Sequence, residues 1–279
     1  MAAAAVLDGL KRRRPEWQPW LAVVAEIVLD STSATWDRVV PASFASRPAN
    51  APLLAGVPLP VDTRLVRDVF QRLIRAASRG GTSKMATLGR AGASDVDLAT
   101  LFEASVWQQH DRIARVASLI GADPEALEAV VALLPVPFLQ ACNRRWASSL
   151  GEDWVEGHCP VCAAWPAFAE VRGIERTRYL RCGRCGSEWH AHALSCPYCA
   201  TRDHHDFLSL VPGNGASHAA IEACTRCHGY MKSFTKLQAC APGAVMLEDL
   251  ATVDLDVAAL EQGCHRPQRV GYRPVPGNV

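Results

Sequence analysis

Residues 178–199 read RYLRCGRCGSEWHAHALSCPYC, a stretch that holds two of the four Cys-x-x-Cys motifs in the chain. The other two are CPVC at 159–162 and CTRC at 224–227. Two residues between cysteines let one tight turn aim both sulfurs at a single ion, and two such turns complete a tetrahedron. One motif is a weak signal, but four in so short a stretch predict two closed four-cysteine metal sites. The predicted ligands are Cys159, Cys162, Cys182, Cys185, Cys196, Cys199, Cys224 and Cys227.

The four motifs, called the first to fourth knuckles in chain order, can combine in two ways. Sequential combination joins the first knuckle to the second and the third to the fourth, across gaps that can each hold a hairpin. The rival arrangement joins the second knuckle to the third and makes the outer two meet. We expect the sequential arrangement because it builds two local and similar units.

Ligand type does not decide which ion the sites hold, because four thiolates in a tetrahedron suit zinc and a single rubredoxin-type iron equally well. Such a site leaves no coordination position open for water, so hydrolytic metal catalysis is not expected. The ions either only stabilise modules too poor in apolar residues to fold alone, or they also transfer electrons. With eight cysteines available, we expect the nearby histidines to lie outside the ligand set. These are His158, His190, His192 and His228.

Composition excludes several classes of protein. The 279 residues carry 29 Lys and Arg against 28 Asp and Glu, a net charge of +1 that favours neither a nucleic-acid nor a membrane partner. We find no run of 18 apolar residues, so no membrane span is expected. All 11 cysteines lie at or after Cys142, and a long chain with an odd number of cysteines is unlike a disulfide-stapled secreted domain.

The amino-terminal region is not typical of an export signal. A basic run at residues 11–14 precedes an apolar stretch at 21–29, but Pro15 and Glu16 separate the two and Glu26 interrupts the second. We interpret the stretch as an amphipathic helix that follows a solvated basic run. The protein is therefore expected in the cytoplasm, where clustered cysteines bind metal more often than they form disulfides.

Apolar residues at helical spacing predict an all-α region over residues 1–154. Its proline-rich stretch at 41–60 is predicted to be a connection without regular structure. One helix is predicted from 95 to 120, and Asp123 followed by Pro124 is typical of the start of the next. Nothing in this half of the chain carries recognisable chemistry.

Short stretches suited to strands lie between the knuckles, such as 168–172 and 178–180, and a helical period returns over 245–261 before Gly263. The predicted fold class is therefore α+β multidomain, with an N-terminal all-α helical domain followed by two small rubredoxin-like (zinc-ribbon-like) four-cysteine metal modules. The predicted boundaries are 1–154 for the helical domain, 155–193 for the first module, and 194–279 for the second module with its closing helix.

Five strings in the same half of the chain go beyond bare Cys-x-x-Cys spacing. They are CPVC at 159–162, RYLRCGRCGSEWH at 178–190, CPYC at 196–199, EACTRCHGYMK at 222–232 and EDLATVDLD at 248–256. In content and order they resemble the formate dehydrogenase accessory (formation) proteins of the FdhE family. That family usually has an arginine shortly before the third knuckle, where this chain has Ala193. An arginine contact at that position is therefore not carried over, whereas the ligand set is untouched.

The resemblance implies a cytoplasmic accessory protein that is not an enzyme. It implies that the protein binds the catalytic subunit of a respiratory formate dehydrogenase and is needed for its maturation into active, export-competent enzyme. It also implies two metal ions per chain, with rubredoxin-type iron favoured and zinc as the alternative. Formation of a homodimer is left open.

Two other functions compete with this hypothesis. Arginines around the second knuckle could track phosphates in a zinc-ribbon nucleic-acid-binding protein. The near-zero net charge and the lack of a regular aromatic series argue against nucleic acid, and a solvated strand face explains the arginines equally well. A rubredoxin-like electron-transfer protein is the other alternative. The arginines are Arg172, Arg176, Arg178, Arg181 and Arg184.

Acidic residues on the predicted closing helix form the predicted partner-binding surface. Their carboxylates could pair with basic residues of an incoming chain, and the twin-arginine export signal expected of the client is one candidate. The alternative is that they are the solvated face of an amphipathic helix. These residues are Glu248, Asp249, Asp254 and Asp256.

Overall fold

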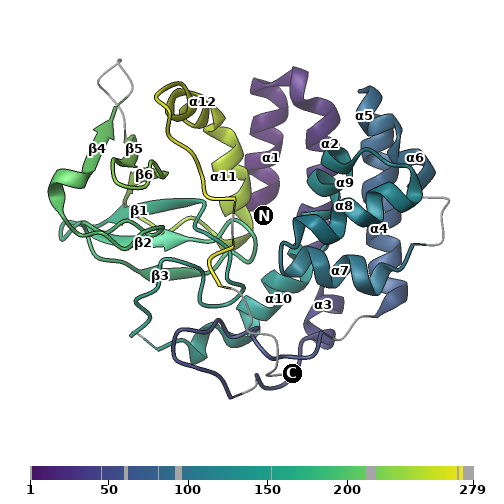
Figure 1. Ribbon diagram of the computed structural model, residues 1–279, viewed down its shortest axis with the longest axis horizontal. Coiled ribbons are helices and arrows are strands. Elements are labelled where there is room, and N and C mark those ends of the chain that lie inside the picture. Colours follow the sequence, from purple (N-terminus) through teal and green to yellow (C-terminus); the bar gives the residue numbers. More distant parts are fainter. Residues whose placement is uncertain are drawn as a thin grey trace. The chain divides into compact units, whose positions relative to one another are not determined.

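The computed structural model describes residues 2–44, 46–59, 62–80, 82–91, 96–151, 153–211, 218–268 and 270–272 (Figure 1). Contacts between residues divide the chain into two compact units. The helical unit comprises Met1–Ser43 and Val57–Arg145, and the sheet unit comprises Phe44–Gly56 and Trp146–Val279. The predicted fold class, a helical part followed by a part with two four-cysteine clusters, is confirmed.

The helical unit owes its core to amphipathic helices. In α4 the residues that recur at helical spacing are buried, among them Val69, Phe70 and Leu73. Asp62 begins this helix, because its side chain accepts hydrogen bonds from two backbone N–H groups of the first turn. The α-helices of the described residues up to 146 are α1 (Ala2–Arg13), α2 (Gln18–Asp30), α3 (Ala34–Val39), α4 (Thr63–Ser78), α5 (Ser83–Ala86), α6 (Leu88–Ala91), α7 (Leu98–Val106), α8 (His110–Ile120), α9 (Pro124–Val131) and α10 (Val136–Trp146), with short 3-10 turns η1 (Pro15–Trp17) and η2 (Ala147–Ser149).

The single helix predicted from 95 to 120 is wrong, because the structure has α7 and α8 there. Gln108 has a φ of 52°, a left-handed conformation that interrupts the α-helix between them. Apolar spacing continues on both sides of this break, so periodicity alone does not reveal it. The predicted start at Asp95 lies outside the described residues. By contrast, Asp123 caps α9 as predicted, by accepting a hydrogen bond from the N–H of Ala126.

One helical stretch among the described residues, Pro124–Ser149, is long and apolar enough to cross a membrane. Most of its apolar window is buried inside the fold. Burial of this kind is what the central helices of a packed helical unit require. The expectation that the chain has no membrane span therefore stays a prediction.

The described part of the sheet unit contains six strands in the order β3-β2-β1-β6-β5-β4 (Figure 1). Neighbouring strands are antiparallel, except that β1 runs parallel to β6 with Phe168 beside Lys232. Strands β1–β3 and β4–β6 are thus two antiparallel groups, one for each predicted module, joined edge to edge in one sheet. The strands are β1 (Phe168–Arg172), β2 (Thr177–Arg181), β3 (Glu188–His190), β4 (Phe207–Leu210), β5 (Ala219–Cys224) and β6 (Tyr230–Lys236).

The closing helix predicted over 245–261 is two helices, α11 (Val245–Ala251) and α12 (Val253–Glu261). They meet at Thr252, whose backbone leaves the α-helical region and whose hydroxyl donates to the carbonyl groups of Glu248 and Asp249. Ala259 of α12 packs in a small core with residues of β5 and β6, so this helix covers part of the sheet. Short 3-10 turns, η3 (His204–Asp206) and η4 (Pro242–Ala244), complete the unit.

The proline-rich connection without regular structure has a role that the sequence does not show. The N–H groups of Leu53 and Leu54 donate to the carbonyl groups of Pro160 and Val161, at 2.7 and 3.1 Å. Both leucine side chains are fully buried. Leu53 and Leu54 therefore bind to the first knuckle, which lies more than 100 residues further along the chain. The predicted three-part division of the domains stays a prediction.

Candidate metal centres

The cysteines of the first and second knuckles form one compact cluster, called the first metal site. Their sulfur atoms all lie within 4.8 Å of one another, with Cys159–Cys185 at 3.4 Å and Cys162–Cys182 at 3.5 Å. Each of the four side chains is at most 1% exposed. This is the sequential combination expected from the spacing.

The third and fourth knuckles form the second metal site. The sulfur atoms of Cys196 and Cys227 are 3.6 Å apart, and those of Cys199 and Cys224 are 3.7 Å apart. In contrast to the first site, this one is open on one side, because Cys199 and Cys227 are only half-buried. The two sites therefore share a geometry but differ in their access to solvent.

Both clusters fit a tetrahedral ion. Four thiolates about 2.3 Å from a central ion would have their sulfurs about 3.8 Å apart, close to the distances observed. A disulfide would need an S–S distance near 2.05 Å, far shorter than any of these. The spacing does not separate zinc from iron.

All four knuckles share one backbone geometry. The N–H of the first cysteine donates to the carbonyl of the residue five positions later, at 2.8 to 3.0 Å. The residue after the second cysteine has a left-handed φ in every case, which turns the chain back over the sulfurs. Glycine occupies this position only in the second knuckle, so glycine alone would not have revealed the repeat. The four residues are Ala163 (φ 65°), Gly186 (φ 77°), Ala200 (φ 58°) and His228 (φ 55°).

Backbone donors also reach the sulfurs of the first metal site. The N–H of Val161 lies 3.4 Å from the sulfur of Cys159, and the N–H of Cys185 lies 3.5 Å from that of Cys182. Burial raises the pKa of Cys159 and Cys185. Burial acts in the same direction on Cys182, but hydrogen bonds from the neighbouring thiols outweigh it and hold its pKa well below the usual range. Four thiolates crowded in one buried place require a cation to neutralise them.

Three of the arginines interpreted as a solvated face are instead held in ion pairs and are mostly or fully buried. The side chains of Arg172, Arg178 and Arg181 are 14%, 4% and 1% exposed. Arg172 and Arg181 both contact Glu170, the latter at 2.8 Å, and Arg178 lies 2.8 Å from Glu222. Since these guanidinium groups are already paired, they are poorly placed to track phosphates. The solvated-face interpretation is therefore wrong for these three residues.

Glu170 is the fully buried centre of this charged cluster. Its carboxylate also accepts a hydrogen bond from the N–H of Cys240 at 2.9 Å. Burial alone would raise the pKa of Glu170, but Arg181 and the other donors outweigh it and hold the pKa below its usual range. The cluster thus joins β1, which follows the first knuckle, to β2, which precedes the second knuckle.

A second buried network joins α11 and α12 to the sheet. Lys232 on β6 is fully buried and lies 2.7 Å from Asp249 and 2.8 Å from Asp256. Arg266 contacts the same two carboxylates, at 2.8 and 2.9 Å. The hydroxyl of Tyr230 also donates to Asp256, at 2.8 Å. The network has two positive and two negative groups, so its charges balance.

These contacts bear on the predicted partner-binding residues. Asp249 and Asp256 already pair with basic residues of this chain, so the solvated-face alternative does not describe them. Glu248 lies 3.5 Å from Lys236, and Asp254 is exposed. Partner binding by these acidic residues stays a prediction.

The other ligand-type residues of the described chain are not members of the two clusters. Within the described residues the clusters contain no histidine and do not include Cys142, Cys240 or Cys264. One further group, Asp203, His204 and His205, comes together in the exposed turn η3. All three residues are exposed.

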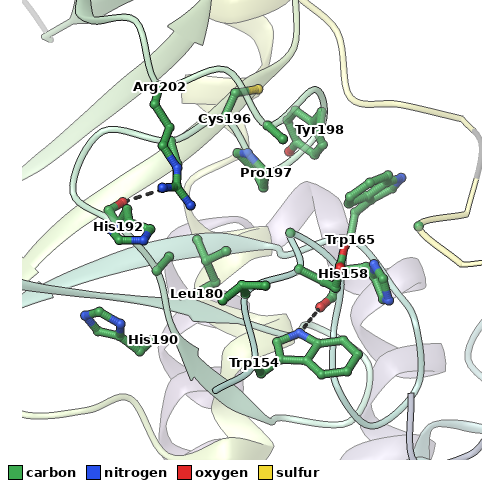
Figure 2. Close-up of a pocket in the computed structure, with 17 residues that line it drawn as sticks. Trp154, His158, Trp165, Leu180, His190, His192, Cys196, Pro197, Tyr198 and Arg202 are labelled. Carbon is green, nitrogen blue, oxygen red and sulfur yellow. Dashed lines mark hydrogen bonds between the residues drawn. The ribbon is translucent and has the colours of Figure 1, made fainter. Parts of the chain in front are cut away.

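A pocket of about 340 Å³ lies within the sheet unit, and the third knuckle and the segments on either side of the first knuckle contribute to its walls (Figure 2). Figure 2 shows Cys196, Pro197 and Tyr198 of the third knuckle across from Trp154 and His158, which precede the first. Burial lowers the pKa of His158 to about 4, so its imidazole is neutral at pH 7. Sequence reasoning missed this pocket, because no local motif shows that the third knuckle lies close to the residues around the first knuckle.

A helical part followed by paired knuckles that share one sheet defines a protein with two rubredoxin-like tetrathiolate sites. Residues 158–192 match the family model described as the FdhE central domain, and residues 194–270 match that of the FdhE C-terminal domain. The part of the chain that carries the metal sites is therefore similar to the FdhE family, and the predicted resemblance is confirmed.

Individual relatives agree with this assignment. The chain is 35% identical over 143 residues to a "Protein FdhE homolog" of Stutzerimonas stutzeri, covering 47% of this chain and 46% of that one. It is 30% identical over 126 residues to that of Aquifex aeolicus, covering 43% and 44%. The chain thus matches a little under half the length of these relatives. The crystal structure of the FdhE protein from Pseudomonas aeruginosa shares the fold, with a TM-score of 0.57 and 21% identity over 97% of this chain and 93% of that one.

Proposed function

We propose that this protein is an accessory factor for a formate dehydrogenase: it binds the catalytic subunit in the cytoplasm and supports its maturation into active, export-competent enzyme. The match of residues 158–192 and 194–270 to the two FdhE domains carries this proposal. The closed four-cysteine sites support an accessory role, because such a site leaves no coordination position for a substrate. We therefore propose that the protein is not itself an enzyme.

Two metal ions per chain are part of the proposal, one in each site. Zinc would contribute folding free energy only, whereas iron would add one-electron chemistry. The family resemblance favours iron, and the sulfur spacing accommodates either. The chain's own part is to hold each set of thiolates in a fixed tetrahedron, shielded from water at the first site and partly open at the second.

One observation favours electron transfer as a second candidate function. The half-buried Cys199 and Cys227 leave the second metal site close to solvent, as an electron-transfer site requires. No comparable observation favours nucleic-acid binding, since Arg172, Arg178 and Arg181 are held in ion pairs.

Binding of the client tests the proposal. Purified metal-loaded protein should form a complex with the purified catalytic subunit of a formate dehydrogenase from the same organism, with a Kd in the range of about 1 µM or tighter. Calorimetric titration measures this affinity, and a DNA duplex titrated at low and high salt is the control for charge-driven binding. The proposal is contradicted if the catalytic subunit does not bind at about 100 µM, or if only the duplex binds.

A further inference from the structure

The pocket beside the first and third knuckles is formed by close packing of segments of the sheet unit. Trp154, Gly157 and Trp165 come from the segments around the first knuckle, whereas Pro197 and Tyr198 belong to the third. A Cβ atom on Gly157 would lie 1.8 Å from the carbonyl oxygen of Pro197, so only glycine allows the two segments to approach this closely. Both predicted modules must therefore be folded for the pocket to exist.

The pocket joins an aromatic interior to a polar rim. Trp154, Trp165 and Tyr198 line it together with the buried Leu180 (Figure 2). The indole N–H of Trp154 is already satisfied, because it donates to the carbonyl of His158 at 2.9 Å. The interior thus offers ring surfaces to a ligand, and an apolar group is the occupant that they fit.

The rim of the pocket is polar, and its basic side chain is that of Arg202. Arg202, His190 and His192 line the pocket and are exposed, and Figure 2 shows Arg202 and His192 on the same side of it. Among the lining residues the one carboxylate is that of Glu156. An acidic group on a ligand would therefore find its partner in the Arg202 guanidinium.

Apolar surface continues outside the pocket. Val155 lines its mouth and is 76% exposed, and Leu194, next to the lining residue Ser195, is 52% exposed. A volume of about 340 Å³ is at the lower limit for a pocket that encloses a small molecule. A small molecule inside it would leave these two side chains uncovered, whereas a chain segment that crosses the mouth would cover them.

We propose that this pocket receives a short extended segment of the client's catalytic subunit, with an apolar side chain in the pocket and an acidic side chain against Arg202. This inference rests on the proposed function and deepens it, because it assigns the client a contact surface. The surface lies beside the knuckles and is separate from the acidic residues on α11 and α12.

The test measures the Kd of the purified catalytic subunit for the metal-loaded full chain by calorimetry. The test variant combines Val155→Asp with Arg202→Glu, both exposed at the pocket. The matched control combines Ile174→Asp with Arg176→Glu, which puts acidic residues in place of an aliphatic one and an arginine at exposed positions of the same unit outside the pocket and the knuckles. We expect at least about tenfold weaker binding for the test variant and less than about twofold for the control.

Metal content and melting temperature of both variants establish that they are folded. Should the test variant lose metal, Arg202→Glu alone replaces it, with an expected loss of at least about threefold. Unchanged affinity in the test variant, or equal weakening in test and control, would overturn the pocket assignment and leave the proposed function standing. If the wild-type protein itself does not bind the catalytic subunit, the proposed function fails and the pocket assignment fails with it.

Discussion

Replacing Cys182 with serine is expected to remove one metal ion and to unfold the sheet unit, while the helical unit stays folded. A structural ion in a closed thiolate site contributes on the order of 10 kcal/mol to folding. That is comparable to the whole stability of an ordinary domain. Since β1 pairs with β6, loss of the first metal site should also loosen the strands around the second. Hydrogen exchange resolved along the chain measures this, with faster exchange expected in β1–β6 and little change in α1–α9.

Cys264→Ser is the matched control, because Cys264 is a half-buried cysteine of the same unit outside both sites. It should keep both ions and the exchange pattern of the wild-type protein. A Cys182→Ser protein that retains two ions, or that exchanges like the control, would show that Cys182 is not a ligand on which the fold depends.

Lys232→Met is expected to lower the free energy of unfolding by about 3–5 kcal/mol. Methionine has a similar length but no charge, so Asp249 and Asp256 would share Arg266 alone and leave one negative charge uncompensated. Denaturation by urea at pH 7 measures the loss. The double variant Lys232→Met with Asp256→Asn restores the balance of charge and should recover part of it. A single variant as stable as the wild-type protein would contradict this account of the network.

The loss of unfolding free energy caused by Lys232→Met should become smaller in acid. Burial pushes the pKa of Asp249 upward, but Arg266 and Lys232 outweigh it, so the folded-state pKa lies below the ordinary value of 3.8. A carboxylate with a lowered pKa contributes its full stability above the unfolded-state value and loses it as the pH falls through the folded-state value. The difference between variant and wild type should therefore be constant near neutral pH and shrink below 3.8. Comparing the two proteins at each pH cancels the acid release of metal that both share.

Local signals in the sequence predict the metal-binding part of the fold well. The spacing of the knuckles predicts that Cys159 and Cys185 share one cluster and that Cys196 and Cys227 share the other, as the structure shows. The strand predicted at 168–172 coincides with β1. These features depend on residues close together in the chain, where turn chemistry and period carry the information.

Features that depend on distant residues could not be predicted in this way. No pattern shows that β1 pairs in parallel with β6, or that Leu53 bonds to the first knuckle, because either pairing needs knowledge of the whole topology. Buried charges mislead for a related reason: Arg181 and Lys232 look like surface residues until their carboxylate partners are known.

The metal content of the intact chain tests the central claim most directly. Protein purified without oxygen and measured by native mass spectrometry should carry two metal ions per chain, one for each set of four cysteines brought together in the structure. Elemental analysis of the same sample identifies the ions as iron or zinc. A wild-type chain that carries one ion or none in such a preparation would contradict the account.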